Sequence, residues 1–138
     1  MHLIKSFCEI NWLAVILVTI LSFALGSLWH SVLFKKGWSA DSGSIYNSQN
    51  HGNPSVIFGL SGILHLILVI GLATFVGRHT NFIGGALKGL FISLIFISTS
   101  IAVTYIFVGR TFRLFLIDAG FYVVFLTVAG MILGAWRV

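Results

Sequence analysis

The chain has 138 residues, of which 58% are hydrophobic and only 8% are charged, and its formal net charge at neutral pH is +5. Soluble globular domains carry about 25% charged residues, so this chain has too few charges to cover a water-facing surface. The high apolar content also excludes a disordered, low-complexity chain. The composition therefore predicts one integral membrane domain and excludes a soluble monomer.

Four segments are long and apolar enough to cross a bilayer, whose core of about 30 Å requires roughly 20 helical residues. We predict helices at about 10–33, 54–77, 82–107 and 114–136, with one sizeable loop at 34–53. Strict alternation of polar and apolar residues is absent, which argues against barrel strands. Because short connections make neighbouring helices antiparallel, we expect a single-domain, all-α four-helix bundle with both termini on one side.

The first segment follows Lys5 and could also be a cleaved signal peptide that ends near Ala24-Leu25-Gly26. Its apolar run continues through Trp29 and Leu33, which is too long for a typical signal core, so we expect a retained helix. In the second segment, Asn53-Pro54 is a strong helix start, with Asn as the N-cap and Pro in the first turn.

Small residues recur along each segment at spacings that allow helices to approach closely. Gly26 belongs to such a stripe on the first segment, and the third and fourth segments contain the small-xxx-small pairs Gly85/Gly89 and Gly130/Gly134. Two interpretations remain open. The glycines pack helices together inside the bundle, or one stripe, most simply that of the fourth helix, joins copies into a homo-oligomer.

The four tryptophans all fall at predicted segment ends, which is typical of the aromatic belt at a membrane interface. These interfacial anchors are Trp12, Trp29, Trp38 and Trp136. Lys and Arg also gather at segment ends, which favours headgroup contact over nucleic-acid binding. Four lie on each face of the predicted bundle, so the positive-inside rule gives no orientation.

The beginning and the end of the chain resemble a family of small membrane proteins. Asn11-Trp12-Leu13-Ala14-Val15 and Gly26-Ser27-Leu28-Trp29-His30-Ser31-Val32-Leu33-Phe34 are similar to its opening motifs, and Asp118-Ala119-Gly120-Phe121-Tyr122 to its last helix. The family is domain of unknown function 1761. The chain departs from its pattern at His30, where the family usually has Tyr, and at Val32, where it has Pro. The resemblance implies the membrane fold and brings no activity with it.

Ionisable residues inside membrane segments are costly, so His30, His65 and Asp118 are candidate functional groups. Helical rise places His30 and Asp118 at a similar depth, about 13 and about 10 Å from the midplane, and His65 near the midplane itself. We therefore expect His30 and Asp118 to face each other, with Tyr122 one turn from Asp118 as a further hydrogen-bond partner. Together with His65 they would form a ligand or proton site.

Simpler interpretations of these groups remain open. Asp118 could be held by the helix N-terminus and by Arg110 or Arg113. His65 could donate a hydrogen bond to a carbonyl or serine of a neighbouring helix. A metal site is a weaker alternative, and the depth difference argues against a haem held by His30 and His65.

The sequence contains no recognisable catalytic motif, phosphate-binding loop or zinc-ligand spacing, and we predict no cofactor, metal or nucleic-acid partner. The leading hypothesis is a non-enzymatic module of the cell (plasma) membrane that assembles with itself or within a larger complex in the lipid bilayer. The alternative is a small permease or proton-binding protein that uses the His/Asp pocket. A membrane enzyme is the least favoured class, because the chain has only three acidic residues.

Overall fold

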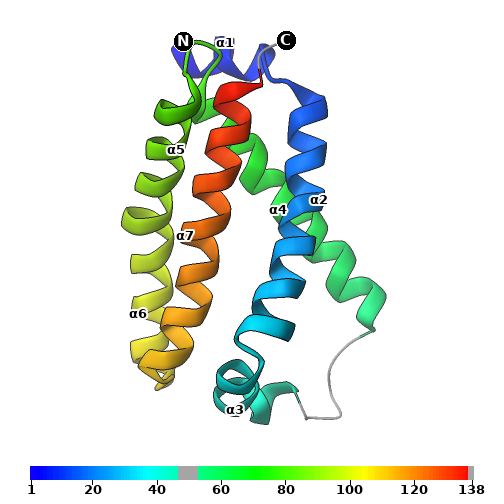
Figure 1. Ribbon diagram of the computed structural model, residues 1–138, viewed down its shortest axis with the longest axis vertical. Coiled ribbons are helices and arrows are strands. Elements are labelled where there is room, and N and C mark those ends of the chain that lie inside the picture. The colour runs from blue at the N-terminus through cyan, green and yellow to red at the C-terminus, as the bar shows by residue number, and fades with distance from the viewer. Residues whose placement is uncertain (47–52, 137–138) are drawn as a thin grey trace.

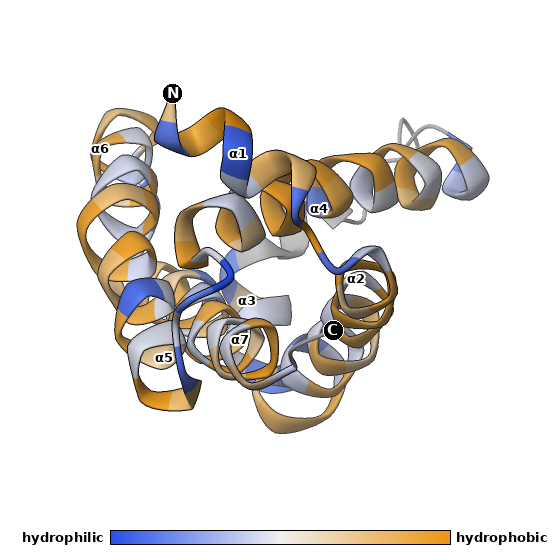
Figure 2. Ribbon diagram, turned by 90° about the horizontal axis from the view of Figure 1, so that it is seen from above, coloured by the Kyte–Doolittle hydropathy of each residue, from blue (hydrophilic) through white to orange (hydrophobic). Residues whose placement is uncertain are grey.

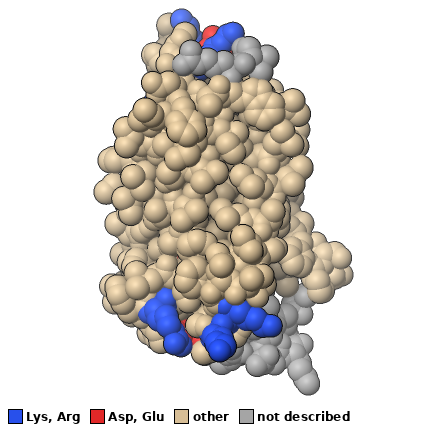
Figure 3. Space-filling model, viewed as in Figure 1, with Lys and Arg blue, Asp and Glu red and all other residues tan. Residues whose placement is uncertain are grey.

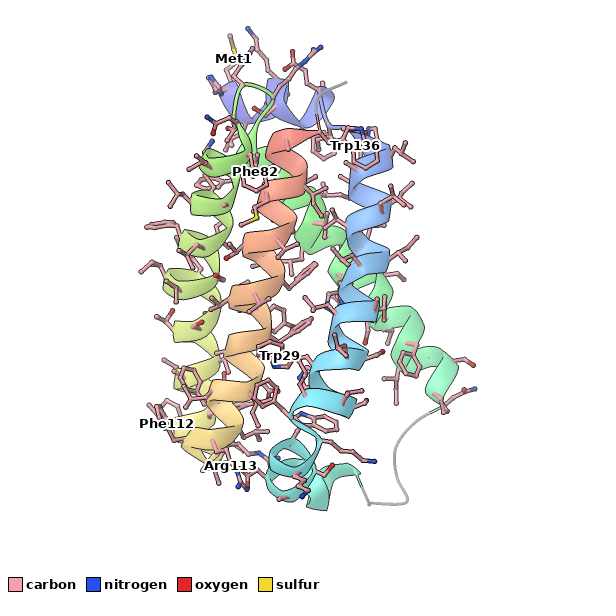
Figure 4. All side chains as sticks on the ribbon, in the orientation of Figure 1. Met1, Trp29, Phe82, Phe112, Arg113 and Trp136 are labelled. Atoms are coloured by element: carbon pink, nitrogen blue, oxygen red, sulfur yellow. The ribbon has the colours of Figure 1, made fainter. Side chains whose placement is uncertain are left out.

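The computed structural model describes residues 1–46 and 53–136 (Figure 1). This part of the chain is mostly helical and has no strand, and it contains four helices long and apolar enough to cross a membrane. These spans are Trp12–Leu33, Pro54–Val76, Phe82–Val108 and Phe112–Ala135. The predicted all-α fold with four such helices is therefore confirmed. Met1 and Trp136 lie at the same end of the bundle (Figure 4).

Two of the spans contain π-helical segments, one at the end of the first span and one in the middle of the third. The first consists of α2 (Trp12–Leu28) and η1 (Trp29–Leu33), and the third of α5 (Phe82–Phe91), η2 (Ile92–Ile97) and α6 (Ser98–Val108). The second span is α4 (Pro54–Val76) and the fourth is α7 (Phe112–Ala135). Single π turns inside α-helices are rare and often occur at functional sites. His30 lies in η1.

Each span begins with a polar N-cap whose side chain accepts a hydrogen bond from a backbone amide of the first turn. The caps are Asn11, Asn53, Asn81 and Thr111. Such caps satisfy amide groups that a helix leaves without partners. The Asn53-Pro54 start expected from the sequence is present, with Asn53 Oδ1 3.0 Å from the Ser55 amide.

Two short helices lie outside the spans. α1 (His2–Cys8) crosses the end of the bundle that carries Met1, and α3 (Lys35–Tyr46) lies at the opposite end (Figure 1). α3 occupies much of the stretch 34–53 that the sequence predicted as a loop, while 47–52 lie outside the described residues. Its many Ser and Gly residues have low helix propensity. Contacts with α7 therefore override the local preference of the sequence.

The tightest helix contact is between α5 and α7, whose backbones touch through glycine. A Cβ atom on Gly85 would lie 2.0 Å from the carbonyl oxygen of Gly130, and one on Gly89 would lie 1.9 Å from that of Leu126. At Gly134 the nearest atom would be the Asn81 oxygen, at 2.4 Å. No side chain fits at these positions. Both small-xxx-small pairs thus face each other within one chain.

The core is centred on α7, which packs against the other three spans. Phe125 and Leu126 are fully buried, together with Val15 of α2 and Val69 of α4. The N-terminal half of α4 diverges from the bundle (Figures 1 and 2), and its first residues are exposed. The described spans carry many exposed large apolar side chains. On the face drawn in Figure 3, Lys and Arg lie at the two ends and leave an uncharged band between them.

Candidate functional site

His30 and Asp118 meet at the interface of the first and fourth spans. Nε2 of His30 lies 3.2 Å from Oδ1 of Asp118, and the two side chains are 23% and 20% exposed. The residues are 88 positions apart in the chain. The structure thus brings together the two groups that helical depth placed at the same level. The residual exposure leaves the pair within reach of water or of a small polar molecule.

The hydrogen bond at Nδ1 of His30 determines which ring nitrogen carries a proton. Nδ1 lies 3.0 Å from the carbonyl oxygen of Gly26, which can only accept a hydrogen bond, so Nδ1 is the donor. Nε2 then either carries a second proton toward the carboxylate or accepts one from a carboxylic acid. In both forms the net charge of the pair is zero, and one proton lies between Nε2 and Oδ1. The backbone of α2 therefore prepares the imidazole to share a proton with Asp118.

Tyr105 of α6 supplies the third group, because its hydroxyl donates a hydrogen bond to Oδ2 of Asp118. The sequence argument selected Tyr122 for this role, and that assignment is not what the structure shows. Within the described chain Tyr122 makes no hydrogen bond to Asp118, and its ring packs edge-on against Phe121 with centroids 5.1 Å apart. Tyr105 and Asp118 flank the short turn at Gly109, and counting from this turn places them within about one helical turn in depth.

Aromatic rings enclose the histidine. The ring centroids of Trp38 and Phe121 lie 5.3 and 5.4 Å from that of His30. The indole N–H of Trp29 donates to the carbonyl oxygen of Ile117, 2.8 Å away, at the residue before Asp118. Gly120 faces the same indole, where an added Cβ would lie 3.3 Å from Cζ2 of Trp29. This contact fixes η1 against α7 beside the pair.

The four tryptophans therefore divide into two groups. Trp29 and Trp38 contact the His30 site. Trp12 and Trp136 lie at the other end of the bundle and line a cavity there. Gly26, which was expected to pack helices, faces the ring of Phe121, where an added Cβ would lie 3.6 Å from Cζ.

α3 is fastened over this end of the bundle by Asp41. Its carboxylate receives hydrogen bonds from Nε and Nη2 of Arg113, both at 2.7 Å, and from the Thr111 hydroxyl, also at 2.7 Å. The Arg113 guanidinium and the Thr111 hydroxyl lower the pKa of Asp41 from its ordinary 3.8 to about 2. Arg113 therefore binds Asp41, and the alternative in which it neutralises Asp118 is not realised.

His65 is separate from this cluster. Its Nδ1 lies 2.8 Å from the carbonyl oxygen of Ser61, one turn earlier in α4, rather than on a neighbouring helix. The imidazole packs between the rings of Phe23 and Phe125, at centroid distances of 5.6 and 6.2 Å. Nε2 is buried and has no hydrogen-bond partner among the described residues. The structure thus places His65 in an aromatic layer and gives it no polar contact with His30 or Asp118.

No group of three or more His, Cys, Asp or Glu side chains in residues 1–46 and 53–136 is arranged to hold a metal ion. Tyr105, Asp118 and His30 come from three different spans and form one continuous chain of hydrogen bonds. This arrangement can hold a proton, move it between a nitrogen and a carboxylate oxygen, and offer both donors and acceptors to a polar ligand.

Comparison with known proteins identifies the family. Residues 13–134 match the family described as "Protein of unknown function (DUF1761)", so the chain belongs to that family, and the resemblance seen in the sequence is confirmed. The match includes the middle spans, where the sequence motifs were not distinctive. No curated protein and no solved structure is similar enough to match.

Proposed function

We propose that this member of the DUF1761 family is a multi-pass protein of the cell (plasma) membrane that binds a proton or a small polar ligand at His30, Asp118 and Tyr105. Membrane placement is supported by four long apolar helices with lipid-compatible side chains on their exposed faces. The uncharged band between two charged ends (Figure 3) has the form expected of a span through hydrocarbon. Both termini would then lie on one side of the bilayer.

The observation that carries the proposal is the sharing of one carboxylate by an imidazole and a phenol. Asp118 faces His30 through Oδ1 and Tyr105 through Oδ2. An ionisable group inside an apolar bundle is retained at a cost, and such groups commonly mark proton or ligand sites. Gly26 already fixes the donor at Nδ1, so a proton arriving at the network moves between Nε2 and Asp118 without reorientation of the ring.

The accessory-module hypothesis loses its main support in the structure. It relied on small-residue stripes that were available for contacts between copies. Gly85, Gly89 and Gly130 are instead buried, and their Cα atoms face backbone of the neighbouring span within the same chain. A partner would have to use another surface. We therefore favour the proton or polar-ligand site over assembly as the function of the bundle.

The proposal is tested by nitrogen-15 NMR of histidine-labelled protein in nanodiscs, with the ring nitrogens of His30 followed from about pH 5 to about pH 9. We expect the Nε2 signal to change with pH and its proton to exchange with bulk water. Asp118→Asn and Tyr105→Phe should each shift the midpoint of this change. His79→Gln, an exposed position remote in sequence from the site, is the matched control and should leave the titration unaltered.

The contrary result is equally clear. If the His30 signals remain constant across this pH range in the native protein and both variants, and the ring protons are protected from exchange, the network is only a structural contact. Binding of polar ligands would then have to be sought at another site.

A further inference from the structure

α3 lies beside the His30 site and is joined to the first span by a single residue. η1 ends at Leu33 and α3 begins at Lys35, so only Phe34 separates the two helices. Its φ of −120° and ψ of 23° lie outside the helical range. The ring of Phe34 packs against Trp29 of the span, with centroids 4.7 Å apart. Residues at the ends of helices commonly act as hinges, and Phe34 occupies such a position.

Trp38 is the part of α3 that lies against the histidine. Its ring meets that of His30 edge-on, at a centroid distance of 5.3 Å. Phe121, whose ring also contacts His30, belongs to α7 and would remain in place if α3 moved. The contact of His30 with Asp118 joins η1 to α7 and does not involve α3. Movement of α3 would therefore uncover one side of the imidazole and leave the hydrogen-bonded network in place.

The apolar contact of α3 with α7 has little interlocking. Opposite Ile117 and Arg113, α3 presents Gly37, which has no side chain to insert between them. Attraction between packed groups grows with the number of atoms in contact, so a glycine contributes little there. α3 is therefore held against the bundle mainly through Trp38 and Asp41.

The polar contact that holds α3 is the ion pair of Asp41 with Arg113, at 2.7 Å, one turn beyond Trp38. The Thr111 hydroxyl donates to the same carboxylate. The side chain of Arg113 is 59% exposed, so water competes for this contact. Ion pairs exposed to this extent contribute little to stability. The pair can therefore break while the rest of the bundle stays folded.

We infer that α3 is a lid over the His30 site, hinged at Phe34 and latched by the Asp41–Arg113 ion pair. In the closed position Trp38 shields the imidazole, and in the open position water or a small polar molecule reaches it. The lid thereby controls how fast protons or ligand exchange with the network. This regulatory role rests on the function proposed above, whereas the movement of α3 does not depend on it.

The movement is tested by pulsed electron paramagnetic resonance of the full-length protein in nanodiscs. Spin labels are attached at Ser39→Cys of α3 and Leu94→Cys of the third span, both exposed positions, in a Cys8→Ser background. We expect one main distance in the otherwise native protein. Arg113→Gln and Asp41→Asn should each increase the share of a longer distance, with an open population about two- to fivefold larger.

The matched control removes a positive charge at the same end of the bundle without touching the latch. Lys36 is exposed and forms no ion pair within the described part of the chain. Lys36→Gln should therefore keep the native distances. A change of equal size in this variant would mean that net charge, and not the latch, positions α3.

The cover over the histidine is tested by modification with diethyl pyrocarbonate, measured for each residue by mass spectrometry. Arg113→Gln should raise the modification rate of His30 by the same factor as the open population. Trp38→Ala should also raise it, and Trp38→Phe should keep the ring protected. His79, which is exposed and remote in sequence from the lid, is the internal reference and should react equally in all variants.

Two results would overturn the inference: identical distance distributions in the native protein, Arg113→Gln and Asp41→Asn, or unchanged modification of His30 in these variants. The lid and the proton site fail separately. A histidine that titrates under an immobile α3 would retain the proton site and remove the lid. A lid that opens over a histidine that does not titrate would remove only the proton site.

Discussion

At the scale of single residues, the polar groups of the bundle differ in how fully they are satisfied. Asp118 receives contacts at both carboxylate oxygens, and both nitrogens of His30 have partners. His65 has a partner at only one nitrogen among the described residues. Changing His30 or Asp118 should therefore lower the free energy of unfolding more than changing His65, because the remaining polar group loses its partner in an apolar setting.

We expect the stability effects of His30→Ala and Asp118→Asn to be non-additive. Each single change leaves the other partner without its contact, so the double variant should be more stable than the sum of the two losses indicates. A coupling of about 0.5–3 kcal/mol is expected for groups in direct contact. Reversible unfolding of the four proteins in mixed micelles measures it. Strict additivity would mean that the two residues act independently.

The Asp41 contact predicts how the attachment of α3 depends on pH. The folded-state pKa of Asp41 is lowered from 3.8 to about 2, so this contact stabilises the fold above about pH 4 and is lost as the pH falls through about 2. The protection factors of the α3 amides, which correct for the pH dependence of intrinsic exchange, should therefore fall over that interval. Asp41→Asn should show fast exchange already at neutral pH and a weaker dependence on acid. Unchanged exchange in this variant would show that other contacts hold α3.

At the scale of elements, the contact between α5 and α7 is the most constrained, because each backbone fills the space where the other would need a side chain. The glycines at this contact leave no room for a methyl group; they are Gly85, Gly89, Gly130 and Gly134. By contrast, a Cβ on Gly59 or Gly71 of α4 would meet nothing within 4 Å. The two kinds of glycine provide a matched comparison within one chain.

Gly89→Ala should therefore be much more harmful than Gly71→Ala. The former forces α5 and α7 apart and should destabilise the protein by about 1–3 kcal/mol or more. The latter adds helix propensity at an open position and should be neutral or slightly stabilising. Thermal unfolding followed by circular dichroism in detergent compares them. Equal effects at the two positions would contradict the close backbone contact.

At the scale of the whole molecule, hydropathy was sufficient to predict the fold. Four long apolar runs leave few alternatives to four helices, and Asn53-Pro54 marked a helix start correctly. The sequence did not reveal α1 or α3, because both are short and α3 depends on an ion pair with a residue 72 positions away. The π-helical segments depend on hydrogen-bond register, which hydropathy does not report.

The candidate site was only partly predictable for a related reason. Rise per residue gives depth along a helix, and depth was enough to bring His30 and Asp118 together. Depth does not give the rotation of one helix against another, which packing sets, so it could not show that Tyr105 of α6 contacts Asp118. The sequence also could not show that both glycine pairs pack against each other within one chain, because that depends on how the helices are arranged.

We expect the two ends of the bundle to face opposite sides of the bilayer, and this can be tested by cysteine labelling. In a Cys8→Ser background, single cysteines at Ser39 and Thr111 should be labelled by an impermeant maleimide from one side of the bilayer, and one at Asn81 from the other. All three positions are exposed. Labelling of Ser39 and Asn81 from the same side would contradict the proposed topology.

The π turn of η1 also determines how many residues the chain uses to reach α3. The Phe34 amide bonds to the Trp29 carbonyl, five residues back, so this turn contains one residue more than an α-helical turn. Deleting Val32, an exposed residue within this turn, would restore the α-helical hydrogen-bond pattern. The direction in which the chain leaves the span would then rotate by about 100°. Trp38 and Asp41 would then point away from His30 and Arg113. The length of this single turn therefore decides whether α3 covers His30 or leaves it open.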